Sequence, residues 1–401
     1  MPRAYWGMWI AIFVVWAGRV VVPFLTLFFT HEAGYSPTVA GLVVSLVGAG
    51  GLLAAATIGG LIDRIGPRRV VLAGLLANAV VCTVMATAPV PAVVAAMTLL
   101  LGYAAQAVGP AGYALIADVL EPPDLRRGYA LYYVGVNAGF AIGPAVGGYL
   151  AARSFALVFW VEAASMLVAA LACAVLVPPG VDAVRRPEPA GAGTSVRVVL
   201  RDRVFMLFVA LHLLFIAVYL QAQVTLPVVL SHAGFATTDY ALLLVLNGVL
   251  LMVLQMPLER VLRAWRQSVL LAVGAGLLAL GYLGQVGAGT LTAYAVCVCL
   301  WTLGELLTMP TVAGVATLMA PPALRGRYLA VSSAVWPLAT LVGPTLGGVT
   351  LEAAGPTGLW LGCAAVGAVG LLGRVAMVPS LDRRVAVVPP SPAPTSTTLE
   401  D

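Results

Sequence analysis

Three ionisable side chains lie inside long apolar stretches of this chain, where a charge is costly. Arg19 lies midway along the first stretch, four residues before Pro23, Glu162 lies about a third of the way into the sixth, and Glu305 lies in the middle of the tenth. A charge at the centre of an apolar membrane helix costs roughly 2.5 to 3.5 kcal/mol on insertion scales, so all three are candidates for binding protons or a charged solute. The alternatives are a structural ion pair for Arg19 and Glu305, and packing near a membrane surface for Glu162.

Uncharged polar side chains form a second group in these stretches. Gln223 precedes Pro227 by four residues, as Arg19 precedes Pro23, so it is the closest counterpart of Arg19 in the seventh stretch. The amides in the central stretches are Gln106, Asn137, Gln221, Gln223 and Asn247. Each could hydrogen-bond a substrate or bridge two helices, a contact worth about 0.6 kcal/mol on average in membranes. Four tyrosines in the same region would suit a large, partly apolar ligand: Tyr103, Tyr113, Tyr132 and Tyr133.

The elements that carry these residues must be membrane helices. The chain is 61% hydrophobic and 9% charged over 401 residues, whereas a soluble domain is typically about 25% charged. A spanning helix needs roughly 20 apolar residues. Twelve such stretches end near residues 29, 62, 88, 117, 150, 177, 230, 261, 287, 317, 352 and 378. We therefore predict an all-α integral membrane protein with twelve transmembrane helices.

The chain repeats itself after about 200 positions. Residues 139–148 read GFAIGPAVGG and residues 339–348 read ATLVGPTLGG, and a Pro-Pro-x-Leu-Arg sequence precedes each. Such a duplication indicates two six-helix bundles and is typical of secondary transporters, whose pathway runs between the repeats. We expect bundles at residues 1–177 and 204–378, joined by a cytoplasmic linker at 178–203. Ser195 to Arg203 within it suits either an interfacial helix or a solvated linker, and residues 379–401 are expected to form a disordered cytoplasmic tail.

The distribution of arginine predicts the orientation. All 21 basic residues are arginine, and 18 of them fall on the cytoplasmic side if the N-terminus lies inside. Only Arg153 falls in an outer loop, so both termini are expected in the cytoplasm. The net charge of +5 is then a consequence of topology, and no nucleic-acid partner is expected. The first stretch has no short hydrophobic core with a cleavage site, so we expect it to be retained.

Several classes of protein are disfavoured. Without lysine there is neither a phosphate-loop lysine nor a Schiff base, which excludes a P-loop ATP-driven pump and a retinal protein. The three histidines are scattered and no hydrolase motif occurs, so no enzyme activity, metal or cofactor is expected. The five cysteines lie within predicted spans, and Cys297 and Cys299 are not spaced as a redox or zinc pair.

The turn between the second and third helices carries a distinctive motif at residues 59–69, GGLIDRIGPRR. Gly66 permits a tight turn, Asp63 can accept from exposed N–H groups at a helix start, and the arginines can pair with Asp118 at the end of the fourth helix. The motif resembles the signature loop of the major facilitator superfamily, G-x-x-x-D-R-x-G-x-R-R. The matching residues are Gly59, Asp63, Arg64, Gly66, Arg68 and Arg69. The corresponding loop at residues 258–266 keeps an acid followed by arginine but lacks the glycine.

The decamer in the fifth helix resembles the antiporter motif of the same superfamily, G-x-x-x-G-P-x-x-G-G. Its residues are Gly139, Gly143, Pro144, Gly147 and Gly148. Glycines four apart line one helix face and permit close approach of another helix, while the proline bends its own helix. The resemblance implies, in addition, an exporter that exchanges a solute against protons.

The segment around Glu305, with residues 320–328 after it, is similar to the multidrug:proton antiporters of the twelve-helix drug-exporter branch. This resemblance places Arg19 and Glu305 in a central cavity and Asp118 at a gate. The sequence departs from the branch at Tyr103, where R-x-x-Q-G is common and this chain reads Tyr-Ala-Ala-Gln106-Ala. Either Arg19 takes over the role of that arginine or proton coupling differs.

Together these patterns predict a proton-driven exporter of the inner membrane for small, partly hydrophobic molecules such as drugs, antibiotics or secondary metabolites. The alternatives are a proton-coupled importer of the same fold and a receptor that transports nothing. Its partners would be a small-molecule substrate, protons and the lipid bilayer, and we expect a monomer. Proton coupling is expected at Glu305, Asp118, Glu162 and Arg19. The substrate cavity is expected to include Arg19, Tyr103, Gln106, Asn137, Gln221, Gln223 and Glu305.

Overall fold

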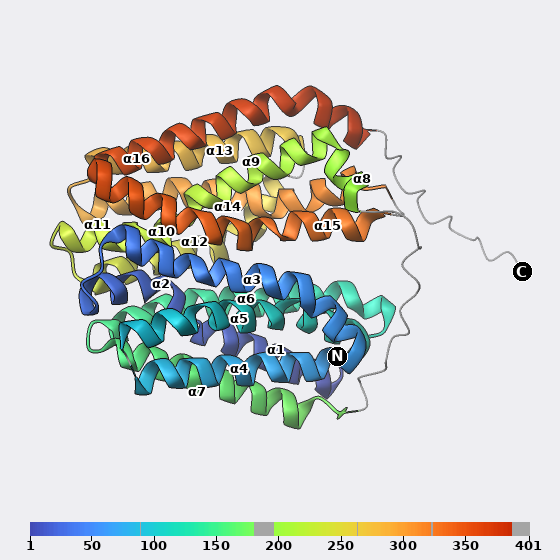
Figure 1. Ribbon diagram of the computed structural model, residues 1–401. Coiled ribbons are helices and arrows are strands. Elements are labelled where there is room, and N and C mark those ends of the chain that lie inside the picture. Colours follow the sequence, from blue (N-terminus) through green and yellow to red (C-terminus); the bar gives the residue numbers. More distant parts are fainter. Residues whose placement is uncertain (89, 180–195, 263, 322–323, 387–401) are drawn as a thin grey trace, which may run out of the picture.

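The computed structural model describes residues 1–401 except 89, 180–195, 263, 322–323 and 387–401. Throughout the described residues the regular elements are helices, and none is a strand. Figure 1 shows two bundles of roughly parallel and antiparallel helices stacked on one another, the first built from the N-terminal half of the chain and the second from the C-terminal half. The expected pair of helical repeats is therefore present.

The first bundle contains six spans. The first span consists of α1 (Arg3–Gly18), α2 (Val21–Leu27) and a π-helical turn at Phe28–Glu32. The others are α3 (Pro37–Ile65), α4 (Pro67–Thr87), α5 (Pro91–Val119), α6 (Pro122–Ala151) and α7 (Phe155–Leu176). Proline occupies the first turn of α3 to α6, where its missing N–H leaves no helical bond unmade.

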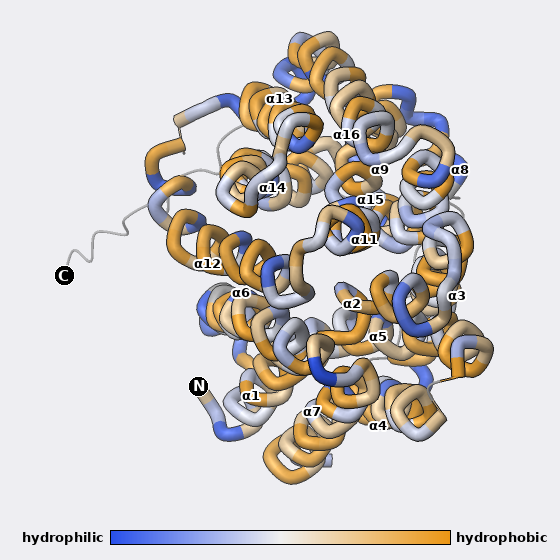
Figure 2. The backbone as a smooth tube through the Cα atoms, turned by 90° about the vertical axis from the view of Figure 1, so that its left-hand side faces the viewer, coloured by the Kyte–Doolittle hydropathy of each residue, from blue (hydrophilic) through white to orange (hydrophobic). Residues whose placement is uncertain are grey.

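The second bundle repeats this plan. A short helix, α8 (Val196–Arg201), precedes a seventh span that is broken into α9 (Arg203–Tyr219), α10 (Gln221–Val224) and α11 (Leu226–His232). There follow α12 (Thr237–Leu262), α13 (Gln267–Gly284) with the 3₁₀ turn η3 (Gln285–Gly287), α14 (Leu291–Met319), α15 (Arg325–Ser333) and α16 (Val335–Ala386). Seen end-on in Figure 2, α2 of the first bundle and α11 of the second face one another near the middle of the molecule.

The described structure has twelve membrane spans when its longest helix, α16, is counted as two. The described residues contain eleven continuous apolar runs long enough to cross a membrane, the last of which covers 59 residues, 326–384. Gly355 interrupts that run with a φ of 65°, which glycine adopts readily, and so separates an eleventh from a twelfth span. The prediction of an all-α membrane protein with twelve helices is confirmed.

Two predicted boundaries need correction. The last helix continues to Ala386, so residues 379–386 belong to it and not to a disordered tail, and residues 387–401 lie outside the described part. Within the predicted linker, α8 is helical, and its Val199 is buried with Phe205 and Phe208 of the second bundle. Residues 196–201 therefore pack as part of the C-terminal bundle, while 180–195 lie outside the described residues.

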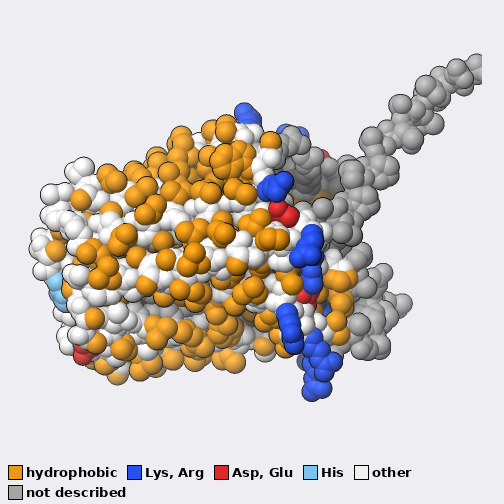
Figure 3. All heavy atoms as spheres, turned by 90° about the horizontal axis from the view of Figure 1, so that it is seen from above, with side chains coloured by type: hydrophobic (Ala, Val, Ile, Leu, Met, Phe, Trp, Pro, Cys, Tyr) orange, Lys and Arg blue, Asp and Glu red, His pale blue; other side chains and the backbone are white. Residues whose placement is uncertain are grey.

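The surface of the molecule matches a membrane environment. Figure 3 shows hydrophobic side chains over the length of the visible face, arginines gathered near one end, and a histidine at the opposite end. We call these the arginine-rich end and the arginine-poor end. An apolar belt between two polar ends is the pattern expected of helices surrounded by lipid.

The two bundles touch along glycine-lined helix pairs. A methyl group built on Gly48 of α3 would collide with the backbone of α16 at Leu341, and one on Gly148 of α6 would collide with Ala241 of α12. Two other motif glycines face α1: a methyl on Gly139 would lie 2.7 Å from the carbonyl oxygen of Phe13, and one on Gly143 would lie 3.2 Å from that of Trp16. A methyl on Gly147 would meet the ring of Phe24 on α2 at 2.7 Å. The predicted close approach at the α6 decamer is confirmed.

Candidate functional site

The strongest candidate site surrounds Glu305 on α14. Its side chain is 8% exposed, and each carboxylate oxygen accepts one hydrogen bond from a neutral donor. Tyr219 Oη donates to Oε1 over 3.1 Å, and Asn247 Nδ2 donates to Oε2 over 3.0 Å. Asn247 also donates to Thr302 Oγ1, one turn before Glu305, over 3.0 Å. Three helices, α9, α12 and α14, thus converge on one buried acid.

The break in the seventh span places Tyr219. Tyr219 is the last residue of α9, and its carbonyl oxygen accepts a hydrogen bond from Tyr282 Oη over 3.1 Å. Its ring packs edge-on to Trp301 at 5.8 Å between centroids and against Trp336 at 5.9 Å. Packing on both sides fixes the ring so that its hydroxyl reaches Glu305. Sequence analysis missed Tyr219. The available signal was its spacing, because residues four apart share a helix face and Tyr219 lies four residues before Gln223, a predicted cavity residue.

Glu162 lies at a different break, in the first span. Its Oε2 accepts hydrogen bonds from the backbone N–H groups of Val20 over 3.0 Å and Val21 over 2.7 Å, and its side chain is 1% exposed. These N–H groups lie at the start of α2, where the helix itself supplies no acceptor, so the carboxylate acts much as a capping residue would. The N–H of Val20 is shared with the carbonyl oxygen of Gly18 at 2.9 Å. This geometry gives Glu162 a structural contact that the sequence did not reveal, because the partners are 142 and 141 positions away.

Arg19 closes α1 beside this break. Its Nη2 donates to the carbonyl oxygen of Ala105 on α5 over 2.9 Å, and its guanidinium lies 4.9 Å from the Trp16 ring centroid. Within the described residues no hydrogen bond or ion pair joins Arg19 to Glu305, so the structural ion pair considered as the alternative for these two residues is not formed in this structure. The guanidinium instead lies against the α5 segment that carries Tyr103 and Gln106.

The predicted cavity amides fall into two groups. Gln221 is buried and bridges helices: its Nε2 donates to Gly343 on α16 and to Ala217, both over 3.0 Å, and its Oε1 accepts from Thr225 over 3.2 Å. Asn137 donates to the carbonyl of Tyr133 in its own helix over 3.0 Å.

Gln106 and Gln223 are half-buried, and their side chains make none of the hydrogen bonds found in the described part of the chain. Their place in a substrate cavity stays a prediction. Tyr103 shares a hydrogen bond of 3.0 Å with Thr57.

The signature loop forms the predicted tight turn. Gly66 has a φ of 87° between α3 and α4, a conformation that favours glycine. Arg68 donates from Nε to Val177 over 2.9 Å and from Nη2 to Ala174 over 3.0 Å, which binds it to the end of α7. Asp63 and Arg64 are exposed, and a methyl built on Gly59 would meet nothing within 4 Å. Pairing of the loop arginines with Asp118 stays a prediction.

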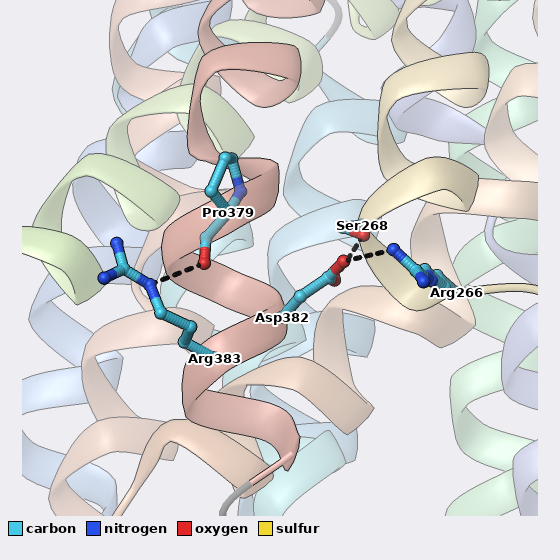
Figure 4. A network of polar contacts seen from close by, with 5 residues as sticks. All are labelled: Arg266, Ser268, Pro379, Asp382 and Arg383. Carbon is cyan, nitrogen blue, oxygen red and sulfur yellow. Dashed lines mark hydrogen bonds and ion pairs between the residues drawn. The ribbon is translucent and has the colours of Figure 1, made fainter.

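The second bundle has a counterpart of this contact, shown in Figure 4. Arg266, at the start of α13, pairs with Asp382 near the end of α16 at 3.3 Å, and Ser268 donates to the same carboxylate over 2.6 Å. In each bundle, an arginine at the start of the third span contacts the end of the sixth span. These arginines are Arg68 in the first bundle and Arg266 in the second. Arg263 lies outside the described residues.

Asp202 anchors the same end of the second bundle. Its Oδ1 accepts from the N–H of Phe205 over 3.2 Å, and its Oδ2 accepts from Tyr328 over 2.8 Å and from Arg384 over 2.6 Å. Burial acts to raise the pKa of Asp202, but these hydrogen bonds, that of Arg384 first among them, hold the pKa below its usual value. An aspartate directly before an apolar helix is an N-cap signature that could have identified it.

Arg374 on α16 is a buried charge that sequence analysis also passed over. It donates to the carbonyl of Leu271 over 2.7 Å and to Thr308 over 3.4 Å, and its guanidinium lies 5.1 Å from the ring centroid of Phe215. These contacts tie α16 to α13, α14 and α9. An arginine inside an apolar stretch was the signal that could have found it.

Contacts between the bundles concentrate toward the arginine-poor end. There His31 meets Ser231 at 2.6 Å, and the N–H of Thr38 donates to Glu352 over 3.2 Å. Deeper in, Ser45 meets Thr345 at 2.9 Å, and Tyr240 donates to the carbonyl of Pro23 over 3.3 Å. Further toward the other end, Gln255 donates to Tyr133 over 3.0 Å. The described structure is closed at its arginine-poor end.

The fold and the buried polar groups define a helical membrane protein built from two repeats. Its sequence matches the Major Facilitator Superfamily over residues 8–331, and the chain belongs to that family, as the signature loop predicted. It is therefore a multi-pass membrane protein of a transporter family.

Relatives at moderate identity cover most of the chain. It is 27% identical over 365 residues to the uncharacterized MFS-type transporter YttB of Bacillus subtilis (strain 168), covering 88% of this chain and 89% of the relative. It is 27% identical over 347 residues to the multidrug resistance protein MdtH of Yersinia pestis (strain Pestoides F), covering 84% of each.

Solved transporter structures share the fold. The peptide transporter POT in complex with sulfate superposes with a TM-score of 0.81 at 15% identity, covering 96% of both chains. A D-xylose-proton symporter superposes with a TM-score of 0.72 at 16% identity, covering 94% of this chain and 95% of that one. At these identities the similarity shows the fold alone.

Proposed function

We propose that the protein is a secondary active exporter that exchanges small, partly hydrophobic molecules for protons by alternating access. The observation that carries the proton-coupling part is the environment of Glu305. It is a buried carboxylate held by two neutral donors, with no cation bonded to it in the described structure. A carboxylate neutralised by a fixed arginine would have little reason to bind a proton, whereas this one has no such charge in contact with it.

The geometry at Glu305 suits repeated protonation. An ionised carboxylate accepts only, and a protonated one must donate from one oxygen. Tyr219 can exchange roles, because its hydroxyl donates to the carboxylate and can accept from the carboxylic acid, while Asn247 donates to Oε2 in both cases. Glu305 can therefore gain and lose a proton without losing either neighbour.

Substrate binding is proposed between the bundles on the side that this conformation leaves less tightly joined. Tyr113 is 46% exposed and Tyr133 is 41% exposed, which offers aromatic surface to a partly apolar molecule. Gln106 and Gln223 would supply hydrogen bonds, and Arg19 would favour a substrate with a neutral or negative group. Rocking of the two bundles about the contact between α3 and α16 would then change which end is open.

The orientation and the direction of transport are part of the proposal. The arginine-rich end would face the cytoplasm under the positive-inside rule, which places both termini inside. Export is supported by the glycine-proline decamer of α6 and by the name of the MdtH relatives. Import with protons is the second candidate, because a D-xylose-proton symporter shares the fold.

The test is transport in proteoliposomes with an imposed pH gradient, using a panel of dyes, antibiotics and sugars. Uphill export of any of them against an inward proton gradient supports the proposal, and uphill uptake with the gradient supports the importer. Glu305→Gln should abolish gradient-driven transport while keeping binding of a neutral substrate. Glu259→Gln, an exposed acid on α12, is the matched control and should transport normally. Uphill transport by Glu305→Gln would contradict proton exchange at Glu305.

A further inference from the structure

Two exposed arginines flank the ion pair that joins the start of α9 to the end of α16. Asp202, directly before α9, pairs with Arg384, near the end of α16, at 2.6 Å. Arg203 follows Asp202 in the chain, and Arg383 precedes Arg384. The ion pair therefore brings Arg203 and Arg383 to neighbouring helix ends, on the arginine-rich end of the molecule.

Both arginines are exposed, and neither is neutralised by an acid. Arg383 donates from Nε to the carbonyl oxygen of Pro379 in its own helix over 3.0 Å, and in Figure 4 its two amino groups point away from Asp382. Arg203 makes no side-chain hydrogen bond or ion pair in the described part of the chain. The aspartates next to them in the chain are already paired with other arginines. Both guanidinium groups can therefore be reached from outside the protein.

Each arginine ends an exposed apolar face of its helix. Leu207, four residues after Arg203, is exposed on α9. Pro379 and Val375, four and eight residues before Arg383, are exposed on α16. Residues four apart share a helix face, and the opposite faces of both helices are buried in one hydrophobic cluster with α8. The apolar faces below the two arginines therefore point toward the surrounding lipid.

The two helices also stay side by side below the ion pair. A methyl group built on Gly373 of α16 would lie 2.5 Å from the side chain of Leu211 on α9. The guanidinium of Arg374 on α16 lies 5.1 Å from the ring centroid of Phe215 on α9. A lipid tail beside this junction can therefore contact both helices over several turns.

The combination of arginine and exposed apolar surface restricts the ligand. A guanidinium matches the geometry of a phosphate and can bind it through two parallel hydrogen bonds. A headgroup with an ammonium group would be repelled by the two arginines, because the neighbouring carboxylates are already bound. A soluble phosphate would use the arginines and leave the apolar faces bare. The ligand that fits all of these features is a phospholipid with a net negative charge.

We propose that Arg203 and Arg383 form a binding site for the headgroup of an anionic phospholipid at the junction of α9 and α16. The phosphate would accept hydrogen bonds from both guanidinium groups, and the acyl chains would lie along Leu207 and Val375. The bound lipid would reinforce the junction that the Asp202 ion pair already makes. The site belongs to whichever leaflet meets the arginine-rich end, so it depends neither on the orientation nor on the direction of transport.

The experiment measures lipid binding to the purified full chain by native mass spectrometry. The probes are dioleoyl phosphatidylglycerol and dioleoyl phosphatidylcholine, which have the same chains and differ in headgroup charge. Phosphatidylglycerol should bind at least tenfold more tightly, since each arginine near an anionic headgroup contributes roughly fivefold. Arg203→Gln/Arg383→Gln should lose at least tenfold in phosphatidylglycerol affinity. Arg3→Gln/Arg127→Gln removes two exposed arginines from the first bundle and, as the matched control, should lose less than twofold.

Two comparisons decide whether a defined lipid site exists. Equal losses in the two double variants would show general attraction by the basic end and would overturn the proposal, as would full retention in Arg203→Gln/Arg383→Gln. Soluble glycerol 1-phosphate should not displace the lipid, because it lacks the acyl chains. Displacement at concentrations comparable to those of the lipid would assign the arginines to a soluble phosphate and overturn the lipid site.

Stability in nanodiscs provides a second readout. In phosphatidylcholine alone, wild type and Arg203→Gln/Arg383→Gln should melt at the same temperature, because both side chains are exposed and neither is paired with an acid. Adding phosphatidylglycerol should raise the melting temperature of wild type and leave that of the double variant unchanged. A lower melting temperature of the variant in phosphatidylcholine alone would make the arginines structural and overturn the proposal. None of these results depends on whether Glu305 carries a proton.

Discussion

The hydroxyl of Tyr219 lies 3.1 Å from Glu305 Oε1, and the two residues are 86 positions apart in the chain. Tyr219 stands where the seventh span breaks, so a change in the geometry of that break would move the hydroxyl relative to the acid. Broken helices at mid-membrane are common at the binding sites of transporters. If Glu305 exchanges protons as proposed, the contact would link its protonation to the shape of α9 to α11.

Tyr219→Phe tests this link. The ring contacts with Trp301 and Trp336 remain, and only the hydroxyl is lost. Hydrogen bonds to charged groups contribute about 1.5–3 kcal/mol, so gradient-driven transport should fall by roughly 10- to 100-fold, and its pH profile should shift to higher pH because the ionised acid loses a donor. Transport rates between pH 5 and 9 in proteoliposomes give the profile.

Trp336→Phe, next to the same ring, is the control for packing. An unchanged pH profile in Tyr219→Phe would show that the hydroxyl does not assist the proton step.

Glu162 is expected to act through the geometry of the first span. Both hydrogen bonds from Val20 and Val21 reach Oε2, so Glu162→Gln keeps an oxygen able to accept them. Glu162→Ala removes this acceptor from the buried N–H of Val21, whereas the N–H of Val20 keeps the carbonyl oxygen of Gly18 at 2.9 Å. Glu162→Ala should therefore lower stability by about 1–3 kcal/mol, the cost of one buried donor left without an acceptor. Thermal unfolding in detergent and transport of one substrate measure both effects.

The conservative variant separates two roles for Glu162. If Glu162 is structural, Glu162→Gln should fold and transport with proton coupling intact. Loss of coupling in Glu162→Gln, with a normal melting temperature, would instead make Glu162 a second proton carrier.

The sequence predicted the parts of the fold that depend on local chemistry. Gly66 and its flanking residues predicted a turn, and the structure has one there with a φ of 87°. The break between Gly18 and Val21 was not predicted, because its stabilising partner is Glu162, in another helix. Glu305 could be recognised as costly in a membrane, but its partners come from α9 and α12. Which groups meet a buried charge depends on the packing of helices, and one sequence does not contain that information.

Gly143→Leu tests the helix contact of the α6 decamer. A methyl at Gly143 would lie 3.2 Å from the carbonyl oxygen of Trp16 and 3.3 Å from that of Ala17, and a leucine side chain would extend further into α1. Overpacking typically costs about 1–3 kcal/mol, so the variant should express poorly or leak protons. Gly370→Leu is the control, since a methyl there meets nothing within 4 Å. Normal expression and tight coupling of Gly143→Leu would mean that α1 moves aside without consequence.

Asp202 should make the stability of the second bundle depend on pH, with stability lost under acidic conditions. Its hydrogen bonds from Arg384, Phe205 and Tyr328 favour the ionised carboxylate, and its pKa in the folded protein lies below the usual value. The stabilisation is therefore fully present above the unfolded pKa of about 3.9 and is lost as the pH falls through the lower folded pKa.

At neutral pH, Asp202→Asn should lose about 1–2 kcal/mol of stability, the value expected of charge-assisted hydrogen bonds that solvent partly screens. Melting temperatures of wild type, Asp202→Asn and the control Glu259→Gln between pH 3 and 8 should show the Asp202→Asn deficit shrinking at the acid end. A deficit that is constant across this range would mean that the carboxylate charge contributes nothing and that the loss comes from helix capping alone.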